Sequence, residues 1–210
     1  SENLEALEKG LPNLLQHVDN VKNVYGLPCV VAINAFPTDT KAELDLVESK
    51  CRELGVNVRL SEVWAKGGEG GLALAEEVVR LCDEPNHFQF VYDVNDSIED
   101  KLNAIATKVY HADGVVIAAS AKKQLKQLTE LGFDKLPICM AKTQFSFSDD
   151  ASKLGAPRGF KITVRDLKVN AGAGFLVAKT GDIMTMPGLP KVPSAEKIDV
   201  DENGKITGLF

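Results

Sequence analysis

The stretch that decides the fold is "PCVVAIN", residues 28–34, a nearly continuous apolar run of strand length. A run of this kind, partly β-branched, is typical of a parallel strand that is covered on both faces. Thr40 and Glu43 follow with the spacing of a capping box, which predicts a helix ending near Gly55. "VNVRL", residues 56–60, predicts the next strand. We therefore expect a strand-helix-strand unit built around a central parallel strand.

The same alternation extends on both sides of this unit. Before it, Gly10 and Pro12 predict two helices, the second running to about Tyr25. After it, a helix is expected with one apolar face, formed by Leu72, Ala75, Val78, Val79 and Cys82. Further strands are expected at 88–93, 114–119 and 136–141, with helices at 98–109, capped by Asp96 and Glu99, and at 122–131. Repeated alternation of this kind predicts an α/β fold with a parallel, doubly wound sheet.

The pattern changes in the last third of the chain. "GFKITVRDLKV" alternates apolar and polar residues, slips phase at Leu167, and is separated from "FLVAK" by "NAGAG", which predicts a hairpin with a bulge or a loose turn. Near the end, Asn203-Gly204 predicts a second hairpin with a type I′ turn. We expect parallel βαβ units followed by a mixed α+β region with antiparallel hairpins, and place two domains at residues 1–94 and 95–210.

Composition narrows the classes of partner. The 30 acidic residues exceed the 24 Lys and Arg, giving a net charge of -6, which disfavours nucleic acid as a partner. No apolar run approaches the length of a membrane span, and the polar, acidic N-terminus is unlike a signal peptide, so we expect a cytoplasmic protein. The four cysteines lack ligand-pair spacing and are expected as reduced core residues: Cys29, Cys51, Cys82 and Cys139.

The common catalytic motifs are absent from these 210 residues. The sequence has no GxxxxGK[ST] phosphate loop, no GxGxxG after a strand and no GxSxG elbow. His17, His87 and His111 have no ligand or nucleophile partner at a recognisable spacing and are interpreted as surface or half-buried residues. No metal site is expected, because the adjacent Asp149 and Asp150 are interpreted as solvated or capping groups. The proline-rich residues 184–193 are interpreted as a segment wrapping over the protein's own surface.

A candidate ligand site remains at the carboxyl ends of the first two strands. Phe36 follows one strand and Trp64, the only tryptophan, follows the next, so two aromatic rings are placed to flank a flat heteroaromatic ligand. Pro37 stiffens the turn after Phe36. The glycine-rich residues 67–71 allow close backbone approach, and Lys66 adds a positive charge beside them. The alternatives, rim packing for the two rings and a flexible helix-start loop for the glycines, remain open on spacing alone.

Residues 2–210 resemble the C-terminal portion of formate-tetrahydrofolate ligase. The resemblance rests on several unusual segments: "INAFPTDT", "LSEVWAKGGEGG", "AKTQFSFSDD", "TVRDLKVNAGAGF", "GDIMTMPGLPK" and "ITGLF". It implies an enzyme that joins formate to tetrahydrofolate with ATP-Mg through formyl phosphate, a monovalent cation that favours the active form, and a homo-oligomer. It also implies that Phe36 and Trp64 flank the folate ring, that Leu60 lines the same pocket, and that Pro37 lies near the adenine.

One departure from the family pattern matters for activity. The resemblance implies a larger N-terminal portion that carries the phosphate loop, and that loop is not among these residues. We therefore expect a folate-binding fragment without ligase activity of its own and without catalytic residues, with Lys66 as a candidate contact for the glutamate tail. The alternative is a free-standing, non-catalytic module that binds folate or assembles with a partner subunit.

Overall fold

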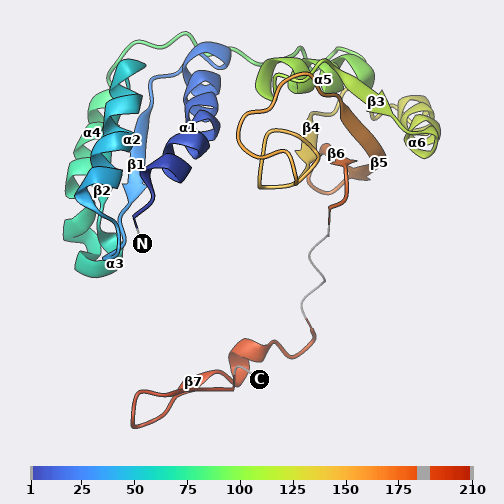
Figure 1. Cartoon of the computed structure of the whole chain (residues 1–210). Coiled ribbons are helices and arrows are strands. Elements are labelled where there is room, and N and C mark those ends of the chain that lie inside the picture. Colours follow the sequence, from blue (N-terminus) through green and yellow to red (C-terminus); the bar gives the residue numbers. More distant parts are fainter. Residues whose placement is uncertain (1, 184–189, 209–210) are drawn as a thin grey trace.

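The structure, a computed structural model, describes residues 2–183 and 190–208. Figure 1 shows two helix-bearing sheets side by side, joined by the segment between α4 and α5. The first part consists of α1 (Leu4–Asp19), a π-helical turn η1 (Asn20–Val24), β1 (Val30–Asn34), α2 (Lys41–Glu53), β2 (Asn57–Ser61), α3 (Val63–Lys66), a 3-10 turn η2 (Gly67–Gly71) and α4 (Leu72–Cys82).

The first part confirms the strand-helix-strand unit. β1 and β2 pair in parallel from Val30 opposite Asn57 to Asn34 opposite Ser61, with α2 as the connection. The Thr40 side chain accepts from the backbone of Glu43, whose carboxylate accepts from the backbone of Thr40, so the capping box is present. Its core lies between the sheet and helices α1 and α2, and consists of Val18, Val31, Cys51, Val56 and Val58.

Two expectations for this part are wrong. β1 is not a central strand, because its sheet has only two strands among the described residues. The break expected at Gly10 and Pro12 does not occur, and α1 continues through both residues. Burial of Leu11 and Val18 on the same helix explains this, because the apolar stripe continues across the two helix breakers.

Helix α4 forms where it was expected but turns another face to the sheet. Leu72, Val78 and Val79 are exposed, while Glu77 is buried. The Glu77 carboxylate accepts hydrogen bonds from Asn57 Nδ2 at 2.7 Å and from an Arg59 nitrogen at 2.9 Å, both on β2. Polar contacts therefore fix the orientation of α4, and the face that the periodicity selects stays in solvent.

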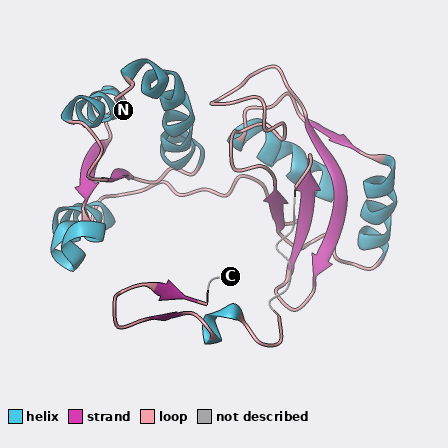
Figure 2. Cartoon of the chain, turned by 60° about the horizontal axis from the view of Figure 1, so that its bottom comes forward, coloured by secondary structure: helices cyan, strands magenta, loops and turns pink. Residues whose placement is uncertain are grey.

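The second part contains a four-stranded mixed sheet. It consists of α5 (Ile98–Ala104), a π-helical turn η3 (Ile105–Val109), β3 (Val115–Ile117), α6 (Ala119–Glu130), β4 (Ile138–Ala141), β5 (Ile162–Asn170) and β6 (Phe175–Thr180). The strand order is β3-β5-β6-β4, with β3 parallel to β5 and β4 parallel to β6. Figure 2 shows the long strands of this sheet on one side and the short β1-β2 pair on the other.

The expected hairpin with a bulge is confirmed in this sheet. β5 and β6 are antiparallel, and their register shifts between Val164 and Asp166. The α/β class, with parallel units followed by a mixed region, is therefore correct. The single doubly wound sheet is not, because the strands divide between separate sheets.

The strand expected at 88–93 is absent, and this segment has an irregular backbone. The hydrogen bonds of its polar groups go to separate partners instead of forming a ladder with a neighbouring strand. Lys108 Nζ donates to the Val91 carbonyl at 2.8 Å, and the Ile138 amide donates to the Tyr92 hydroxyl at 2.9 Å. The helix that follows is capped by the Ser97 side chain, rather than by Asp96.

The two π-helical turns are built alike. In η1 the Tyr25 amide bonds to the Asn20 carbonyl, and the next residue, Gly26, has a φ of 70°. In η3 the Tyr110 amide bonds to the Ile105 carbonyl, and the next residue, His111, has a φ of 54°. A strand follows each turn at the same spacing. The turns also contact each other, because Asn20 Nδ2 donates to the Val109 carbonyl at 2.9 Å. The two parts of the chain therefore meet at these matching turns.

The C-terminal hairpin pairs β7 (Asp199–Val200) with β8 (Ile206–Thr207), after a 3-10 turn η4 (Ser194–Glu196). In Figures 1 and 2 it lies apart from both sheets. Its turn is not type I′, because Gly204 has a positive φ and Asn203 does not. The Gly204 amide bonds to the Asp201 carbonyl at 2.9 Å, as in a type I turn followed by a glycine bulge.

The cysteines are all free, as expected, but only some belong to the core. Cys51 is buried and Cys29 is half-buried. Cys82 and Cys139 are exposed, which corrects the expectation that all four are core residues. Cys82 is the last residue of α4 and lies on the face that the periodicity wrongly predicted to be buried.

Candidate functional site

The candidate site lies at the carboxyl ends of β1 and β2. The two strands end level with each other, since Asn34 and Ser61 are register partners and the Ala35 amide donates to the Ser61 carbonyl at 3.0 Å. The chain then leaves both strands on the same edge of the pair. The loop carrying Phe36 and the short helix carrying Trp64 therefore start side by side.

Phe36 begins a tight turn. Its amide donates to Asp39 Oδ2 at 2.8 Å, and the Asp39 amide donates back to the Phe36 carbonyl at 3.0 Å. Pro37 occupies the second position of this turn, where its fixed φ is favourable. The stiffened turn expected from the sequence is therefore present, and it leaves the Phe36 ring 50% exposed.

Trp64 lies on α3, and the glycine-rich turn η2 packs against the start of this helix. The Glu62 amide donates to the Gly70 carbonyl at 3.0 Å. A Cβ added at Gly70 would lie 2.5 Å from the carbonyl carbon and oxygen of Glu62. Gly70 thus permits a close backbone approach, although the contact is with the protein's own chain two residues before Trp64.

The structure brings the two aromatic rings together. Their centroids are 6.4 Å apart, with the ring planes tilted by 42°. This is the range in which aromatic pairs attract each other. Trp64 is 66% exposed, so neither ring is held in the core. The arrangement is an exposed aromatic pair at the strand ends, rather than an open slot with parallel walls.

The other predicted site residues, Leu60, Lys66 and Pro37, each have contacts of their own near this pair. Leu60 lines a separate hollow of about 320 Å³, together with Ile33 of β1 and Leu44 of α2. Lys66 Nζ forms an ion pair with Glu62 Oε2 at 2.7 Å, so its charge is already partnered in this state. Pro37 lies in the turn described above.

His17, Asp149 and Asp150, which were singled out in the sequence, have structural contacts, whereas His87 is exposed. The His17 ring lies 4.5 Å from that of Phe147, and burial, with a smaller effect of Lys142, lowers the pKa of His17. Asp149 accepts from the Thr163 amide at 2.8 Å. Asp150 accepts from Ser152, which agrees with a capping role. Of the proline-rich segment 184–193, residues 184–189 lie outside the described residues.

The sequence did not point to a second group of polar residues, around Lys142. Its Nζ donates to the carbonyls of Thr143 and Ser146 and lies 5.3 Å from the centre of the Tyr110 ring. Burial lowers the pKa of Lys142 to about 8. One sequence pattern could have pointed to Tyr110: the same Val-Tyr pair ends both π-helical turns, so Tyr110 corresponds to Tyr25.

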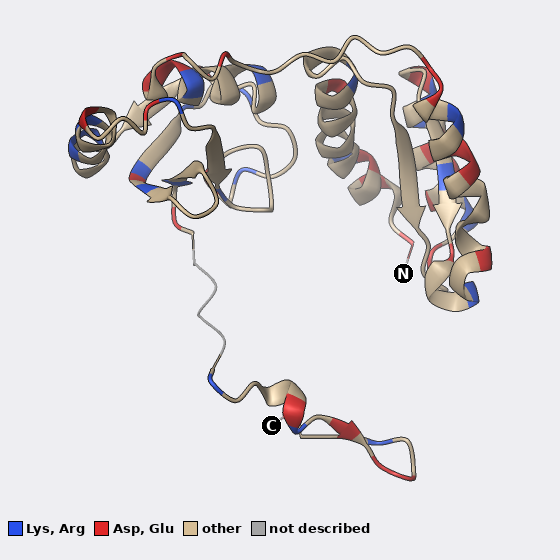
Figure 3. Ribbon diagram, turned by 180° about the vertical axis from the view of Figure 1, so that it is seen from behind, with Lys and Arg blue, Asp and Glu red and all other residues tan. Residues whose placement is uncertain are grey.

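Charges in the described part of the chain are mixed rather than segregated. Figure 3 shows basic and acidic residues interspersed along the helices beside β1 and β2. Within residues 2–183 and 190–208, no three or more His, Cys, Asp or Glu side chains gather as a possible metal site. No helix in the same ranges combines the length and apolar character of a bilayer span.

Comparison with known protein families gives one match that covers the whole chain. The family model described as formate-tetrahydrofolate ligase matches residues 1–210. The chain therefore belongs to the formate-tetrahydrofolate ligase family.

Proposed function

We propose that this chain is the folate-binding part of a formate-tetrahydrofolate ligase, and that Phe36 and Trp64 hold the fused ring of tetrahydrofolate. The observation that carries the proposal is the exposed aromatic pair, 6.4 Å apart at the carboxyl ends of two parallel strands. Ligands of parallel sheets bind at such edges, because the loops there converge. Family membership supplies the ligand class, and the aromatic pair supplies surfaces suited to a flat ring.

Binding of a ring between Phe36 and Trp64 requires a small rearrangement. Each ring-to-ring contact needs about 3.5 to 4 Å, so a sandwich needs centroids roughly 7 to 8 Å apart. The observed centroid separation of 6.4 Å is shorter than this, and the ring planes are tilted by 42° instead of being parallel. Trp64 is the ring that moves, because its side chain is mostly in solvent, whereas hydrogen bonds to Asp39 fix the Phe36 turn.

The other residues of the proposed site act around the ring. Leu60, which lines the neighbouring hollow in this state, is proposed to line the folate pocket as well, and Pro37 lies on the side of the adenine. Lys66 binds the glutamate tail after leaving its ion pair with Glu62. That exchange replaces one carboxylate partner with another, so its net contribution is the difference between two exposed ion pairs and is close to zero.

In this proposal the chain binds folate, and another portion of the enzyme binds ATP and transfers its phosphate. Transfer of the ATP γ-phosphate to formate needs groups that bind phosphates and magnesium, and the phosphate loop that usually supplies them is not among these residues. This chain then holds the folate amine where formyl phosphate is delivered. We propose that the chain alone binds folate and does not make 10-formyltetrahydrofolate.

Calorimetric titration with tetrahydrofolate tests the role of the aromatic pair. Trp64→Ala removes one stacking surface and is expected to weaken binding by about 1 to 3 kcal/mol, roughly 5-fold to 150-fold. Trp64→Phe should recover part of this affinity. The matched control is Phe145→Ala, which removes a ring that is 59% exposed elsewhere on the surface. Equal affinities of the wild type and Trp64→Ala would reject the proposed site.

An activity assay separates the two readings of the chain. The wild-type chain is incubated with formate, ATP-Mg and tetrahydrofolate, alone and together with an ATP-binding portion of a family member. Product only in the combined sample supports the folate-binding part of a ligase. Folate binding without product in either sample favours the non-catalytic module.

A further inference from the structure

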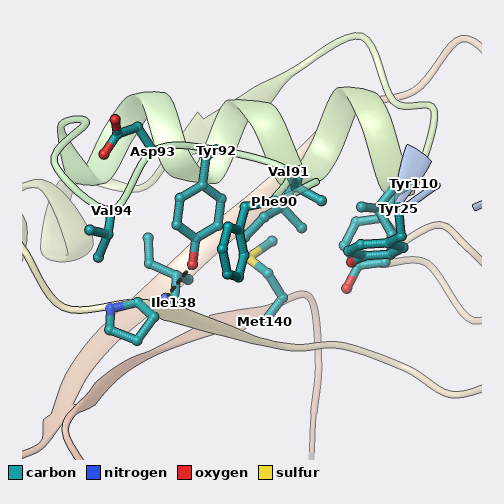
Figure 4. A pocket seen from close by; sticks show the side chains of 12 residues that line it. Tyr25, Phe90, Val91, Tyr92, Asp93, Val94, Tyr110, Ile138 and Met140 are labelled. Carbon is teal, nitrogen blue, oxygen red and sulfur yellow. Dashed lines mark hydrogen bonds between the residues drawn. The ribbon is translucent and has the colours of Figure 1, made fainter. Parts of the chain in front are cut away.

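A cavity of about 870 Å³ lies in the second part of the chain, and Tyr25 of the first part also borders it. It is formed by the ends of both π-helical turns, the irregular segment 90–94 and the edge strand β4. Figure 4 shows the rings of Tyr92, Phe90, Tyr25 and Tyr110 below the α5-η3 helix, with Met140 beside Phe90. A cavity of this size is in the range that holds cofactors and drug-sized molecules.

Two hydrogen bonds join segment 90–94 to the other walls of this cavity. The Tyr92 hydroxyl accepts from the Ile138 amide at 2.9 Å, which joins segment 90–94 to β4. Lys108 Nζ donates to the Val91 carbonyl at 2.8 Å, which joins the same segment to η3. Both neighbours therefore hold the irregular segment in place at the cavity wall.

The chemistry of the lining is aromatic and nearly uncharged. Among the lining residues, Asp93 carries the only carboxylate, and none is a lysine, arginine or histidine. Burial, with smaller effects of Tyr25 and Cys139, raises the pKa of Tyr110 to about 12, so its hydroxyl stays neutral at physiological pH. The lining thus offers aromatic faces and neutral hydroxyl groups, and no basic side chain to pair with an anion.

Phe90 is the exposed residue of this lining. Its ring is 81% exposed, although it meets the Phe88 ring edge-on at a centroid distance of 5.0 Å. A ring that borders an aromatic cavity and remains in solvent gains apolar contact when a flat molecule enters beside it. Phe90 is therefore the residue whose removal tests occupancy with the least effect on folding.

We propose that this cavity is a binding site for a small planar aromatic molecule that carries no net negative charge. The site is separate from the folate site, because it lies at the η1 end of β1, whereas Phe36 and Trp64 lie beyond the opposite end of that strand (Figure 1). The proposal does not depend on the proposed function. Volume and aromatic lining select the shape of the ligand, and the lack of basic lining residues selects its charge.

Fluorescence titration of the full chain with Nile red, a neutral planar dye, tests this site. We expect saturable binding with one dye per chain and blue-shifted emission. Phe90→Ala should weaken binding about fivefold or more, through the lost ring contact. Val94→Trp places a larger side chain at the cavity wall and should weaken binding further. Phe145→Ala, which removes an exposed ring outside the lining, should leave the affinity unchanged.

Two comparisons make the test decisive. The anionic dye 8-anilinonaphthalene-1-sulfonate should bind more weakly than Nile red, and excess tetrahydrofolate should not displace Nile red. Circular dichroism checks that each variant keeps the wild-type fold. Non-saturable Nile red binding to the wild type, or equal affinity for the wild type, Phe90→Ala and Val94→Trp, would overturn the site. Tighter binding of the anionic dye would overturn the charge preference.

Discussion

Substitution of Gly70 by alanine should destabilise the chain and displace Trp64. The added Cβ would lie 2.5 Å from the carbonyl carbon and oxygen of Glu62 and 2.9 Å from the Val63 nitrogen. All these atoms belong to backbone, so a side-chain rotation cannot relieve the overlap. The two segments must separate by nearly 1 Å to reach an ordinary contact, which starts at 3.4 Å.

The expected magnitude follows from two terms. Separation by that amount stretches the 3.0 Å hydrogen bond from the Glu62 amide to the Gly70 carbonyl beyond the usual range. The lost bond costs about 0.5 to 1.5 kcal/mol. Overpacking costs a further 1 to 3 kcal/mol or so in a rigid site, and less here because η2 is largely exposed. We expect the free energy of unfolding to fall by about 2 kcal/mol.

Gly68 provides a matched control in the same turn. A Cβ at Gly68 meets nothing within 4 Å, and its φ is not positive. Gly68→Ala should therefore raise stability by about 0.4 to 1 kcal/mol, because it restricts the unfolded chain. The two alanine variants are expected to change stability in opposite directions.

Urea unfolding followed by circular dichroism measures both stabilities, and the emission of the single tryptophan reports the surroundings of Trp64 before unfolding. Gly70→Ala should lower the midpoint and shift this emission, whereas Gly68→Ala should do neither. If Gly70→Ala matched Gly68→Ala in stability and emission, the close approach between η2 and Glu62 would have no energetic role, and the reasoning would be refuted.

Two further predictions concern buried charged groups. Lys101 is fully buried, and its Nζ donates to the carbonyls of Asp134 at 2.6 Å and Leu136 at 3.1 Å. Lys101→Met leaves both carbonyls without this donor and should lower the free energy of unfolding in urea by about 1 to 3 kcal/mol. An unchanged unfolding midpoint would contradict this prediction. Hydrogen bonds from Arg80 and Asn57 lower the pKa of Glu77 from 4.5 to about 2, so its contribution to stability is fully present above about pH 4.5 and is lost as the pH falls toward 2. Glu77→Gln should flatten this part of the stability profile in unfolding measurements between pH 7 and pH 2.5, and a profile parallel to the wild type would exclude Glu77 as its source.

Sequence patterns were most successful where short-range interactions decide the structure. The capping box at Thr40 and Glu43 is present because its partners are three residues apart and need no distant contact. The proximity of Phe36 and Trp64 could also be anticipated, because consecutive parallel strands usually lie side by side and carry their following loops to one edge. What these rings bind remains a proposal.

The face that a helix buries depended on distant partners. Periodicity selected Val78 and Val79 on α4, but the structure buries Glu77, because Asn57 and Arg59 on β2 offer hydrogen bonds to its carboxylate. In the same way, segment 88–93 has the composition of a strand and does not form one. Its hydrogen bonds go to the Lys108 side chain of η3, the Ile138 amide of β4 and the Tyr25 carbonyl, which no local pattern shows.

The sequence by itself determined the α/β class, most of the helices and strands, the family resemblance and the pair of rings at the end of β1 and β2. Only the tertiary structure decided how the strands divide between sheets, that α1 continues through Pro12, and that Tyr25 and Tyr110 meet at one cavity. The physical reason is range. Capping, turns and periodicity act within a few residues, whereas burial and side-chain hydrogen bonds act between residues that the sequence places far apart.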